Sequence, residues 1–342
     1  MRIGIDTRKI ADFGIGTYIR GLLTALVAER SDERYVAFAP QRLAHHLPAG
    51  VEHVVVDAPH YSVQELVALG RAVDRSNIDL FHAPHYVVPF TRTPLVVTIH
   101  DLIHLRHRNP LARLYARQMI ARAVGKSRRV LTVSEAVKRD IVAVFGCDGD
   151  HVVVTPNGVG APFVQTDLAP HARNAARTAF LYVGNDKPHK NVDILVDAFA
   201  AAGLAGTSLV LVGAPFERFR ARDGVVVPGF VRDDELAALY RDAIALAMPS
   251  GEEGFGLPAL EAMASGCAVI TSNAAALVEI TGDAALHVEP NAGAIGGAMR
   301  RVASDEALRQ TLARRGVERA RTFTWTRCAD LTRGVYRASM TR

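Results

Sequence analysis

The sequence predicts an α/β protein built from two doubly wound domains with parallel sheets. Short apolar segments alternate with amphipathic helical segments along nearly the whole chain of 342 residues. Several apolar segments, such as "LVVTI" at 95–99 and "LVLVG" at 209–213, are apolar at consecutive positions. Such runs are typical of parallel strands that are buried on both faces. The alternation occurs twice, on either side of a central stretch rich in turn residues, and this predicts two domains.

The predicted elements follow one another in a regular order. In the first half, the predicted strands are Arg2–Asp6, Tyr35–Phe38, Glu52–Val56, Leu80–Ala83, Leu95–His100, Val130–Val133 and Val152–Thr155, with helices that include Thr17–Ala28, Gln64–Asp74, Leu111–Val124 and Glu135–Phe145. In the second half, the predicted strands are Phe180–Gly184, Leu209–Val212, Val225–Val227, Ala245–Pro249, Ala268–Thr271 and Leu286–Val288, with helices such as Asp234–Ala243. The break between the halves lies in 158–178, which predicts domains at 1–165 and 172–324.

The bulk composition is that of a globular protein. Hydrophobic residues make up 49% of the chain, which allows a large core. No apolar run reaches the roughly 18 residues that a membrane span needs. No apolar signal region follows the opening "MRIGID", so we expect a cytoplasmic protein. The three cysteines follow no pattern, which argues against a zinc site or a disulfide framework and fits a reducing compartment.

The net charge of +5 is distributed unevenly. The window 102–134 holds eight Lys or Arg residues and no Asp or Glu, so the rest of the chain is net negative. This window predicts a local basic face, for which a solvated surface helix is the alternative interpretation. Nucleic-acid binding would need aromatic residues among the basic ones, and Tyr115 is the only aromatic residue in the window. We therefore expect no nucleic-acid partner.

The stretch "PSGEEGFGLPALEAMASG", at 249–266, is the first candidate site. In parallel sheets ligands bind outside the carboxyl ends of the strands, and this loop follows a predicted strand. Pro258 is suited to a first helical turn, and the N–H groups of Gly256 and Leu257 then form an anion site with the helix dipole. Glu261 is placed to accept hydrogen bonds from ribose, and Glu253 to meet sugar hydroxyls or a developing positive charge. The alternative is that both acids only stabilise the helix start, by about 0.3–1 kcal/mol each.

A second candidate lies in "LYVGNDKPHKN", at 181–191, where a predicted strand ends at Gly184. Lys187 and Lys190 follow this strand on the same predicted edge of the sheet. Lys190 is placed to neutralise a diphosphate leaving group, and hydrogen bonds to charged groups of this kind contribute about 1.5–3 kcal/mol. The alternative is a solvated lysine before a helix.

In the first half, the strand "VTIHD" ends at His100 and Asp101. The pair suits hydrogen bonding to a sugar or to an acceptor hydroxyl, and a structural histidine is the alternative. A hydrolase would need a nucleophile motif such as G-x-S-x-G, which the sequence lacks. Gly14 and Gly16 in "FGIGTYIRG" precede a predicted helix and form a further anion-binding geometry, although they do not match the dinucleotide fingerprint.

The sequence predicts no metal and no cofactor, because no H-x-H, C-x-x-C or D-x-D cluster suggests a metal site. A transferase that uses a nucleotide-sugar without a metal must stabilise the leaving diphosphate by lysines and helix N-termini. Both features are present among the candidates.

Taken together, the motifs resemble family 4 of the retaining glycosyltransferases, whose GT-B fold has two Rossmann-like domains facing across a cleft. The segments that carry the resemblance are "GIGTYIRGLL", "VTIHDLIHL", "LTVSEAVKRDI", "PNGV", "YVGNDKPHKN", "GFVRDDELAALYRDA" and "EGFGLPALEAMASGCAVITSN". Within the family, the chain is most similar to bacterial mannosyltransferases of O-antigen and capsule assembly. The resemblance implies donor binding in the second domain, acceptor binding in the first, and packing of a last helix at 325–342 on the first domain.

The resemblance also implies roles for single residues. Glu261 would bind the donor ribose, Lys190 the phosphate, and Glu253 and His100 the donor sugar. The remaining donor-side positions are Gly16 near the diphosphate, Gly184 and Asn185 at the strand end, Phe230 and Val231 by the base, and Phe255, Gly256 and Leu257 by the sugar and phosphate, while Asp101 lies on the acceptor side. Asn185 stands where many members of the family have an arginine, so that Lys187 or another cation must replace its charge, or the stabilisation of the leaving group is weaker.

The implied reaction moves a sugar from a nucleotide donor with retention at the anomeric carbon, with GDP-mannose as the best guess and a glycan or lipid-linked acceptor. The basic segment 111–129 would rest on anionic lipid at the inner face of the cell membrane, with Leu111, Leu114, Tyr115 and Ile120 on one side of the helix. The alternatives are a UDP-sugar-dependent transferase, a nucleotide-sugar epimerase of the same fold, and a non-catalytic scaffold that binds the donor.

Overall fold

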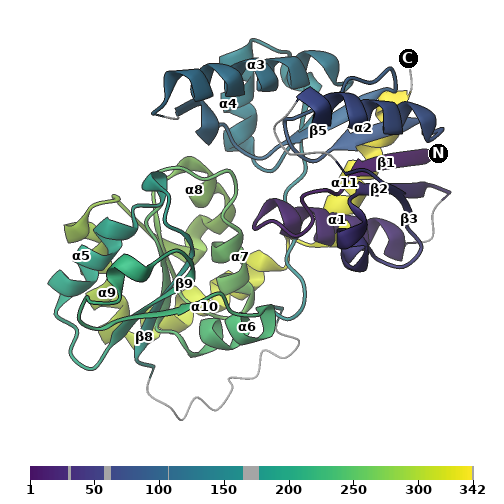
Figure 1. The fold of residues 1–342 in the computed structure, drawn as a ribbon. Helices are drawn as coiled ribbons and strands as arrows, with labels where there is room; N and C mark the ends of the chain where they lie inside the picture. The colour runs from purple at the N-terminus through teal and green to yellow at the C-terminus, as the bar shows by residue number, and fades with distance from the viewer. Residues whose placement is uncertain (30–31, 58–62, 107, 165–176, 341–342) are drawn as a thin grey trace. The chain divides into compact units, whose positions relative to one another are not determined.

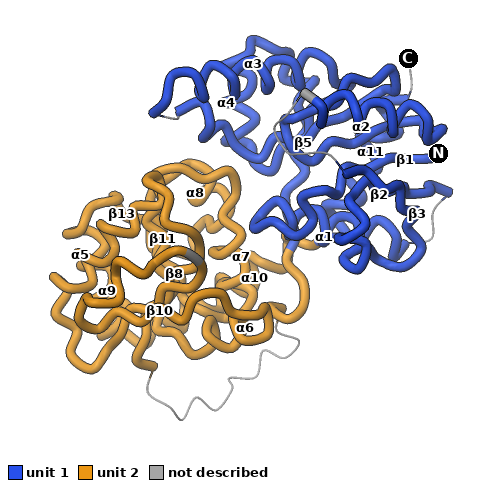
Figure 2. The backbone as a smooth tube through the Cα atoms, viewed as in Figure 1, with its two compact units in different colours: residues 1–158, 325–342 blue, residues 159–324 orange. Residues whose placement is uncertain are grey.

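The computed structural model describes residues 1–29, 32–57, 63–106, 108–164 and 177–340. The chain forms two compact units, which Figure 2 shows in different colours. Unit 1 comprises Met1–Gly158 and Trp325–Arg342, and unit 2 comprises Val159–Thr324. The break that the sequence predicts at 158–178 falls largely on residues 165–176, which lie outside the described residues.

Unit 1 is built on a seven-stranded sheet in which every neighbouring pair is parallel, with strand order β3-β2-β1-β4-β5-β6-β7 (Figure 1). The strands are β1 (Arg2–Asp6), β2 (Arg34–Ala39), β3 (Glu52–Val55), β4 (Leu80–Ala83), β5 (Leu95–Ile99), β6 (Val130–Thr132) and β7 (Val152–Val154). The helices are α1 (Ile15–Ala28), α2 (Val63–Arg75), α3 (Pro110–Lys126), α4 (Glu135–Phe145) and α11 (Trp325–Met340). This order places the carboxyl ends of β1, β4 and β5 side by side.

The last helix of the chain, α11, packs on α1 within unit 1. Gly21 makes this contact close, because a Cβ atom at its position would lie 2.2 Å from the Trp325 ring. Tyr336 of the same helix is fully buried beside Tyr18 in one hydrophobic cluster. The end of the chain therefore completes the core of its first unit.

Unit 2 repeats the scheme with a six-stranded parallel sheet, in the order β10-β9-β8-β11-β12-β13. The strands are β8 (Ala179–Asn185), β9 (Ser208–Ala214), β10 (Val225–Gly229), β11 (Ala245–Met248), β12 (Val269–Ser272) and β13 (Ala285–Val288). The helices are α5 (Val192–Ala202), α6 (Asp233–Asp242), α7 (Leu257–Ala264), α8 (Ala275–Thr281), α9 (Ala292–Ser304) and α10 (Glu306–Ala320). Here β8 and β11 are neighbours, so the two loops that the sequence selects leave the sheet at adjacent points.

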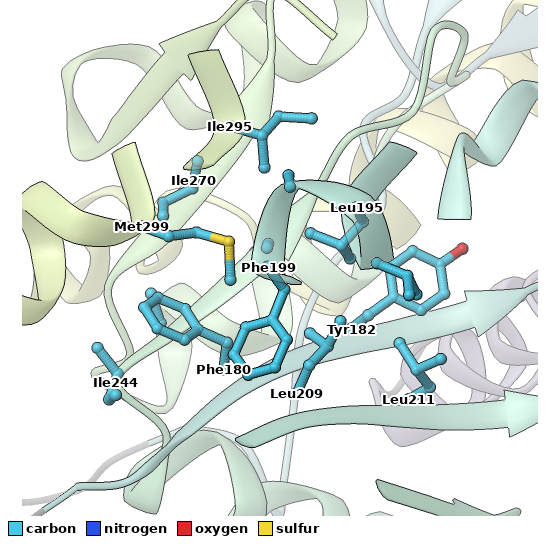
Figure 3. Close-up of a cluster of buried hydrophobic side chains, with 14 of the residues drawn as sticks. Phe180, Tyr182, Leu195, Phe199, Leu209, Leu211, Ile244, Ile270, Ile295 and Met299 are labelled. Atoms are coloured by element: carbon cyan, nitrogen blue, oxygen red, sulfur yellow. The ribbon is translucent and has the colours of Figure 1, made fainter. Parts of the chain in front are cut away.

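The core of unit 2 joins the sheet to α5 and α9. Figure 3 shows Phe180 of β8 beside Phe199 of α5 and Met299 of α9. The two helices approach closely at Gly296, where a Cβ atom would lie 3.0 Å from the carbonyl oxygen of Ala198. Burial of aromatic and aliphatic side chains on this scale is the main stabilising term of such a unit.

The two parallel α/β units confirm the predicted fold class, and the predicted strands and helices agree with the structure to within a few residues. The first helix begins at Ile15 rather than at the predicted Thr17, because Gly14 adopts a positive φ of 60° and serves as the N-cap. The sequence analysis did not predict the short 3₁₀ helices, such as Gln41–His46 and Pro188–Lys190. Among the described residues, no helix combines the length and the apolar composition needed to cross a bilayer.

Candidate active site

Two loops at adjacent strand ends of unit 2 are tied to each other. One follows β8 and the other follows β11. The side-chain amide of Asn191 donates to the carbonyl of Pro249 at 2.9 Å, and the N–H of Gly251 donates to the carbonyl of His189 at 2.8 Å. These bonds fix the position of the first loop relative to the second. They bring together Lys190 and Glu253, which lie 63 positions apart in the sequence.

The result is an ion pair between Lys190 and Glu253. The ammonium nitrogen Nζ of Lys190 lies 2.5 Å from Oε1 of Glu253. The side chains are only 16% and 9% exposed, so the pair is poorly screened by water. The sequence selects both residues but does not predict this contact, because it assigns one to a phosphate and the other to a sugar.

The helix that follows, α7, begins in the way the sequence predicts. Gly256 is its N-cap with φ 99°, and a Cβ atom there would lie 2.5 Å from Leu277, so both the backbone conformation and the space require glycine. Glycine offers no side chain to accept hydrogen bonds from the first turn, and Pro258 has no N–H of its own. The N–H of Leu257 and the positive end of the helix dipole are therefore available to an anion.

Phe255 lies just before this helix start. Its ring is 4% exposed and packs edge-on against Phe323, with ring centroids 5.8 Å apart. This packing anchors the loop after β11 to the interior of unit 2. This burial gives the Phe255 ring a packing role, and the role that the resemblance implies for Phe255 stays a prediction.

Glu261 lies on α7, one turn beyond the helix start. Glu261 is half-buried as a residue, and its carboxylate accepts a hydrogen bond from the hydroxyl of Tyr240 at 3.2 Å. Burial raises the pKa of Glu261 to about 8, while the Tyr240 hydrogen bond acts in the opposite direction. A carboxyl group in this state is suited to neutral partners such as hydroxyl groups. The sequence analysis selects Glu261 but not Tyr240, which comes from another helix.

The end of β8 contains the departure from the family pattern. The hydroxyl of Tyr182 donates a hydrogen bond to the backbone carbonyl of Asn185 at 2.9 Å, and the N–H of Lys187 donates to the side-chain oxygen of Asn185 at 3.3 Å. A Cβ atom at Gly184 would lie 2.8 Å from the Tyr182 hydroxyl, so glycine is needed there as well. Lys187 is exposed, and its ammonium group has no ion pair among the described residues. It is the cation nearest in sequence to Asn185.

Phe230 and Val231 follow β10, at the edge of the same sheet. Phe230 is 69% exposed, and Val231 is half-buried. The next residue, Arg232, caps α6 together with Glu235, whose carboxylate accepts the Arg232 N–H at 3.0 Å. This cap fixes the chain directly after the exposed ring. An exposed aromatic ring on a fixed backbone is a suitable surface for a nucleobase.

In unit 1 a pocket of about 60 Å³ opens at the carboxyl ends of β1, β4 and β5. Its lining includes His100 and Asp101, which the sequence selects, and also Lys9, His85 and His104. The imidazole nitrogen Nε2 of His100 lies 2.9 Å from the carbonyl of Pro84, which only accepts, so this nitrogen donates and Nδ1 carries no proton in the neutral ring. Burial lowers the pKa of His100, which favours that neutral form.

The neighbouring positions of unit 1 are held rigidly. Oδ1 of Asp101 accepts the N–H of Ile103 at 3.0 Å, which orders the turn after β5. Gly16 lies in the first turn of α1, where a Cβ atom would be 2.6 Å from the carbonyl oxygen of Ile10. Glycine is required there for packing, whether or not a diphosphate binds nearby.

A buried charge cluster, joined to this pocket through His85, was not predicted from the sequence. The guanidinium of Arg8 binds the carboxylate of Asp6 at 2.6 and 2.8 Å and lies 2.9 Å from Glu65. His85 adds a contact to Asp6 at 3.2 Å. Although burial alone would raise it, these partners hold the pKa of Asp6 well below its usual range. The "DTR" that follows the first buried strand was the available signal.

The prediction that the protein uses no metal stays a prediction. Within the described ranges, no group of three or more His, Cys, Asp or Glu side chains is arranged to hold a metal ion. The three cysteines are free thiols, and Cys267 and Cys328 are buried.

The fold matches known structures along its whole length. Sucrose-phosphate synthase from Thermosynechococcus elongatus superposes with a TM-score of 0.82 at 20% identity. The superposition covers 99% of this chain and 98% of the synthase chain. The Anabaena protein HepE in complex with UDP-glucose superposes with a TM-score of 0.77 at 19% identity and covers 98% and 100% of the two chains. The two parallel units are those of the GT-B glycosyltransferases.

Sequence comparison gives the family. A model of "Glycosyltransferase Family 4" matches residues 14–161, and a model of "Glycosyl transferases group 1" matches residues 164–319. The chain is also 27% identical over 281 residues to O-antigen chain mannosyltransferase B of Escherichia coli. This alignment covers 75% of this chain and 74% of the relative. The chain therefore belongs to the glycosyltransferases that join a family 4 domain to a group 1 domain.

Proposed function

We propose that this glycosyltransferase moves a sugar from a nucleotide-sugar to a glycan or lipid-linked acceptor in cell-surface polysaccharide assembly, with mannose from GDP-mannose as the first candidate. The observation that carries the proposal is the Lys190–Glu253 pair, held 2.5 Å apart in the loops next to the start of α7. The similarity to an O-antigen mannosyltransferase supports the choice of sugar. The reaction would then take place on the cytoplasmic side, where nucleotide-sugars are made.

In this proposal the diphosphate of the donor binds at the start of α7. The N–H of Leu257 and the helix dipole attract it, and Lys190 adds a positive charge from the loop after β8. Lys187, whose ammonium group forms no ion pair within the described part of the chain, supplies the charge that Asn185 does not. Together these groups stabilise the leaving group without a metal ion.

The two acids act on either side of the diphosphate. Glu261 accepts ribose hydroxyls, and Glu253 contacts the sugar and stabilises the positive charge that develops at its anomeric carbon. The bond from this carbon to the diphosphate breaks while the acceptor oxygen bonds to the same face. The acceptor proton passes to a phosphate oxygen of the leaving group. The configuration is thereby retained, and no side chain is required as a general base.

A UDP-sugar is the second candidate donor. The observation that favours it is the likeness to HepE, whose structure contains UDP-glucose. The exposed Phe230 ring accepts either base by stacking, so the sheet edge does not itself decide between them.

The proposal is tested by a transfer assay in EDTA, with octyl α-mannoside as acceptor and GDP-mannose or UDP-glucose as donor. We expect product from GDP-mannose, and nuclear magnetic resonance should show an α-linkage, because the donor is itself an α-linked sugar. A β-linked product would contradict retention. A strict requirement for added Mg²⁺ would contradict metal independence, and product from UDP-glucose alone would favour the second donor.

We also propose that α3 contacts an anionic membrane. Leu111 is 76% exposed, Leu114 52% and Tyr115 41%, and Arg113 and Arg117 are exposed among them. Apolar side chains beside basic ones suit a surface of anionic lipid, to which each basic residue contributes about 1 kcal/mol.

The structure corrects one detail of the predicted membrane helix and assigns a structural role to one of its arginines. Ile120 does not share the exposed side with Leu111, because it is fully buried in the core of unit 1. Arg122 donates to the carbonyls of Val88 and Pro89 and lies over the Phe90 ring at 4.3 Å, so it is a structural residue.

The membrane test therefore leaves Arg122 unchanged. Replacing Arg113, Arg117 and Lys126 by Gln should release the protein from sedimenting phosphatidylglycerol vesicles. Neutral phosphatidylcholine vesicles are the control and should bind neither form. Equal sedimentation of the variant and the wild type with anionic vesicles would refute membrane contact through α3.

A further inference from the structure

Glu261 is held by a residue for which the function proposed above has no role. Tyr240 lies on α6, and its hydroxyl donates to Oε2 of Glu261 at 3.2 Å. Among the described residues, the structure gives the side chain of Glu261 no other hydrogen bond. One carboxylate oxygen is thus engaged by the protein, and the other is left to accept from a ligand.

The Tyr240 hydroxyl is itself fixed. The tyrosine is fully buried, and the Phe163 ring lies edge-on against it, with centroids 6.0 Å apart. Phe163 is in turn tied to the segment after α7, because the hydroxyl of Ser265 donates to its carbonyl at 3.3 Å. A buried ring has few conformations to lose on ligand binding, so Tyr240 holds the carboxylate in one orientation before the ligand arrives.

The chemistry of the carboxylate limits what it binds. Glu261 is a half-buried residue on the helix whose first turn is the proposed diphosphate site. Within the described residues, no Lys or Arg forms an ion pair with it. Hydroxyl groups are neutral donors that reach a carboxylate at such a site, and in a nucleoside diphosphate they are those of the ribose.

We propose that Tyr240 is a positioning residue that orients Glu261 toward the ribose and thereby makes the enzyme select ribonucleotides over deoxyribonucleotides. This proposal rests on the proposed function, since it requires a nucleotide donor in unit 2. The proposal adds to the site a residue, Tyr240, that lies outside the two loops after β8 and β11. It also predicts a property that a purely structural tyrosine would not have, because only an oriented carboxylate discriminates hydroxyl from hydrogen.

The titration of Glu261 gives a second signature. Burial raises its pKa to about 8, the Tyr240 hydrogen bond lowers it, and Asp233 on α6 raises it further. Burial raises the pKa of Tyr240, and Cys267, which follows α7, raises it further. The ionised carboxylate is the better acceptor, so preference for ribose should increase as the pH rises through about 8. Removal of the Tyr240 hydroxyl should move this transition to higher pH.

The experiment measures binding by calorimetry, with GDP and UDP each compared with its 2′,3′-dideoxy form, from pH 6.5 to 9.5. The proteins are the wild type, Tyr240→Phe and Thr281→Val. The Thr281 hydroxyl donates to Leu277 at 2.7 Å in the same unit, so the control also loses one buried hydroxyl. We expect the wild type and Thr281→Val to prefer the ribose form by about tenfold or more. Tyr240→Phe should lose most of this preference, with a transition at higher pH.

Three results would overturn the proposal. The first is an unchanged preference in Tyr240→Phe. The second is an equal loss of affinity for both forms, which would indicate a structural role alone. The third is binding of GDP or UDP to the wild type without any preference for ribose. That result would leave the proposed donor site intact but contradict the binding of ribose hydroxyls by Glu261. If the wild type bound no nucleotide, the proposed function itself would fail.

Discussion

The Lys190–Glu253 pair places opposite charges in one nearly buried site. In the proposed function each group contacts a different part of the donor, the lysine the phosphate and the glutamate the sugar. In the structure they form an ion pair at 2.5 Å. The proposed function therefore requires that a donor replace this contact with one to each group.

This arrangement predicts opposite effects of Glu253→Gln on binding and on transfer. Transfer should fall by about 10²-fold or more, because the charge that stabilises the transition state is lost. A nucleoside diphosphate should bind at least as tightly as before, because Lys190 no longer has an anionic partner. Calorimetry and the transfer assay check the two effects. The control is Glu252→Gln, which removes the neighbouring charge, and full transfer by Glu253→Gln would refute the role of Glu253.

A histidine in the core of unit 1 predicts sensitivity to acid. His82 contacts the Tyr336 hydroxyl and the Thr98 hydroxyl, both at 2.7 Å, and burial lowers its pKa to about 3. Because the folded-state pKa lies below the ordinary value near 6.5, its contribution to stability is fully present above pH 6.5. That contribution is lost as the pH falls toward 3, by up to about 1.4 kcal/mol per pH unit.

We therefore expect the melting temperature of the wild type to fall between pH 7 and pH 4. The fall should be smaller in His82→Gln, which has no proton to gain. Thermal unfolding followed by circular dichroism at both pH values measures the difference. Equal falls in the two proteins would show that other groups cause the acid sensitivity.

At the scale of elements, the contact between α1 and α11 depends on one small residue. A Cβ atom at Gly21 would lie 2.2 Å from the Trp325 ring, whereas one at Gly125 of α3 would meet nothing within 4 Å. Gly21→Ala should therefore destabilise the protein by about 1–3 kcal/mol through overpacking. Gly125→Ala should stabilise it by about 0.5–1 kcal/mol, because alanine is the better helix former. Urea unfolding measures both changes, and equal effects would contradict this packing.

The elements themselves were predictable, whereas most contacts between them were not. Buried parallel strands carry consecutive apolar residues, and Gly256 with Pro258 marks the start of α7, so local sequence was sufficient. Tyr240 is not marked in this way, because its relation to Glu261 arises only when α6 and α7 pack together. The same holds for the Lys190–Glu253 pair, whose members the sequence selects for separate roles.

At the scale of the whole molecule, the long motifs predicted the family because they specify particular strand ends and helix starts, at which we propose that a nucleotide binds. The acceptor has no comparable signature. We expect its contacts to come from short loops such as the one that carries Asp101, whose pocket also includes Lys9 and His104. Such loops differ in their side chains without changing the fold that positions them.

The most direct test of the account is thermal unfolding of the whole protein with GDP, UDP or ADP, in EDTA and again with Mg²⁺. A ligand at 100 times its dissociation constant adds about 2.7 kcal/mol of stability. The account predicts strong stabilisation by GDP in EDTA, no further gain from Mg²⁺, and loss of the effect in Lys190→Ala. Stabilisation by none of the nucleotides under either condition would contradict the claim that unit 2 binds a nucleotide-sugar donor.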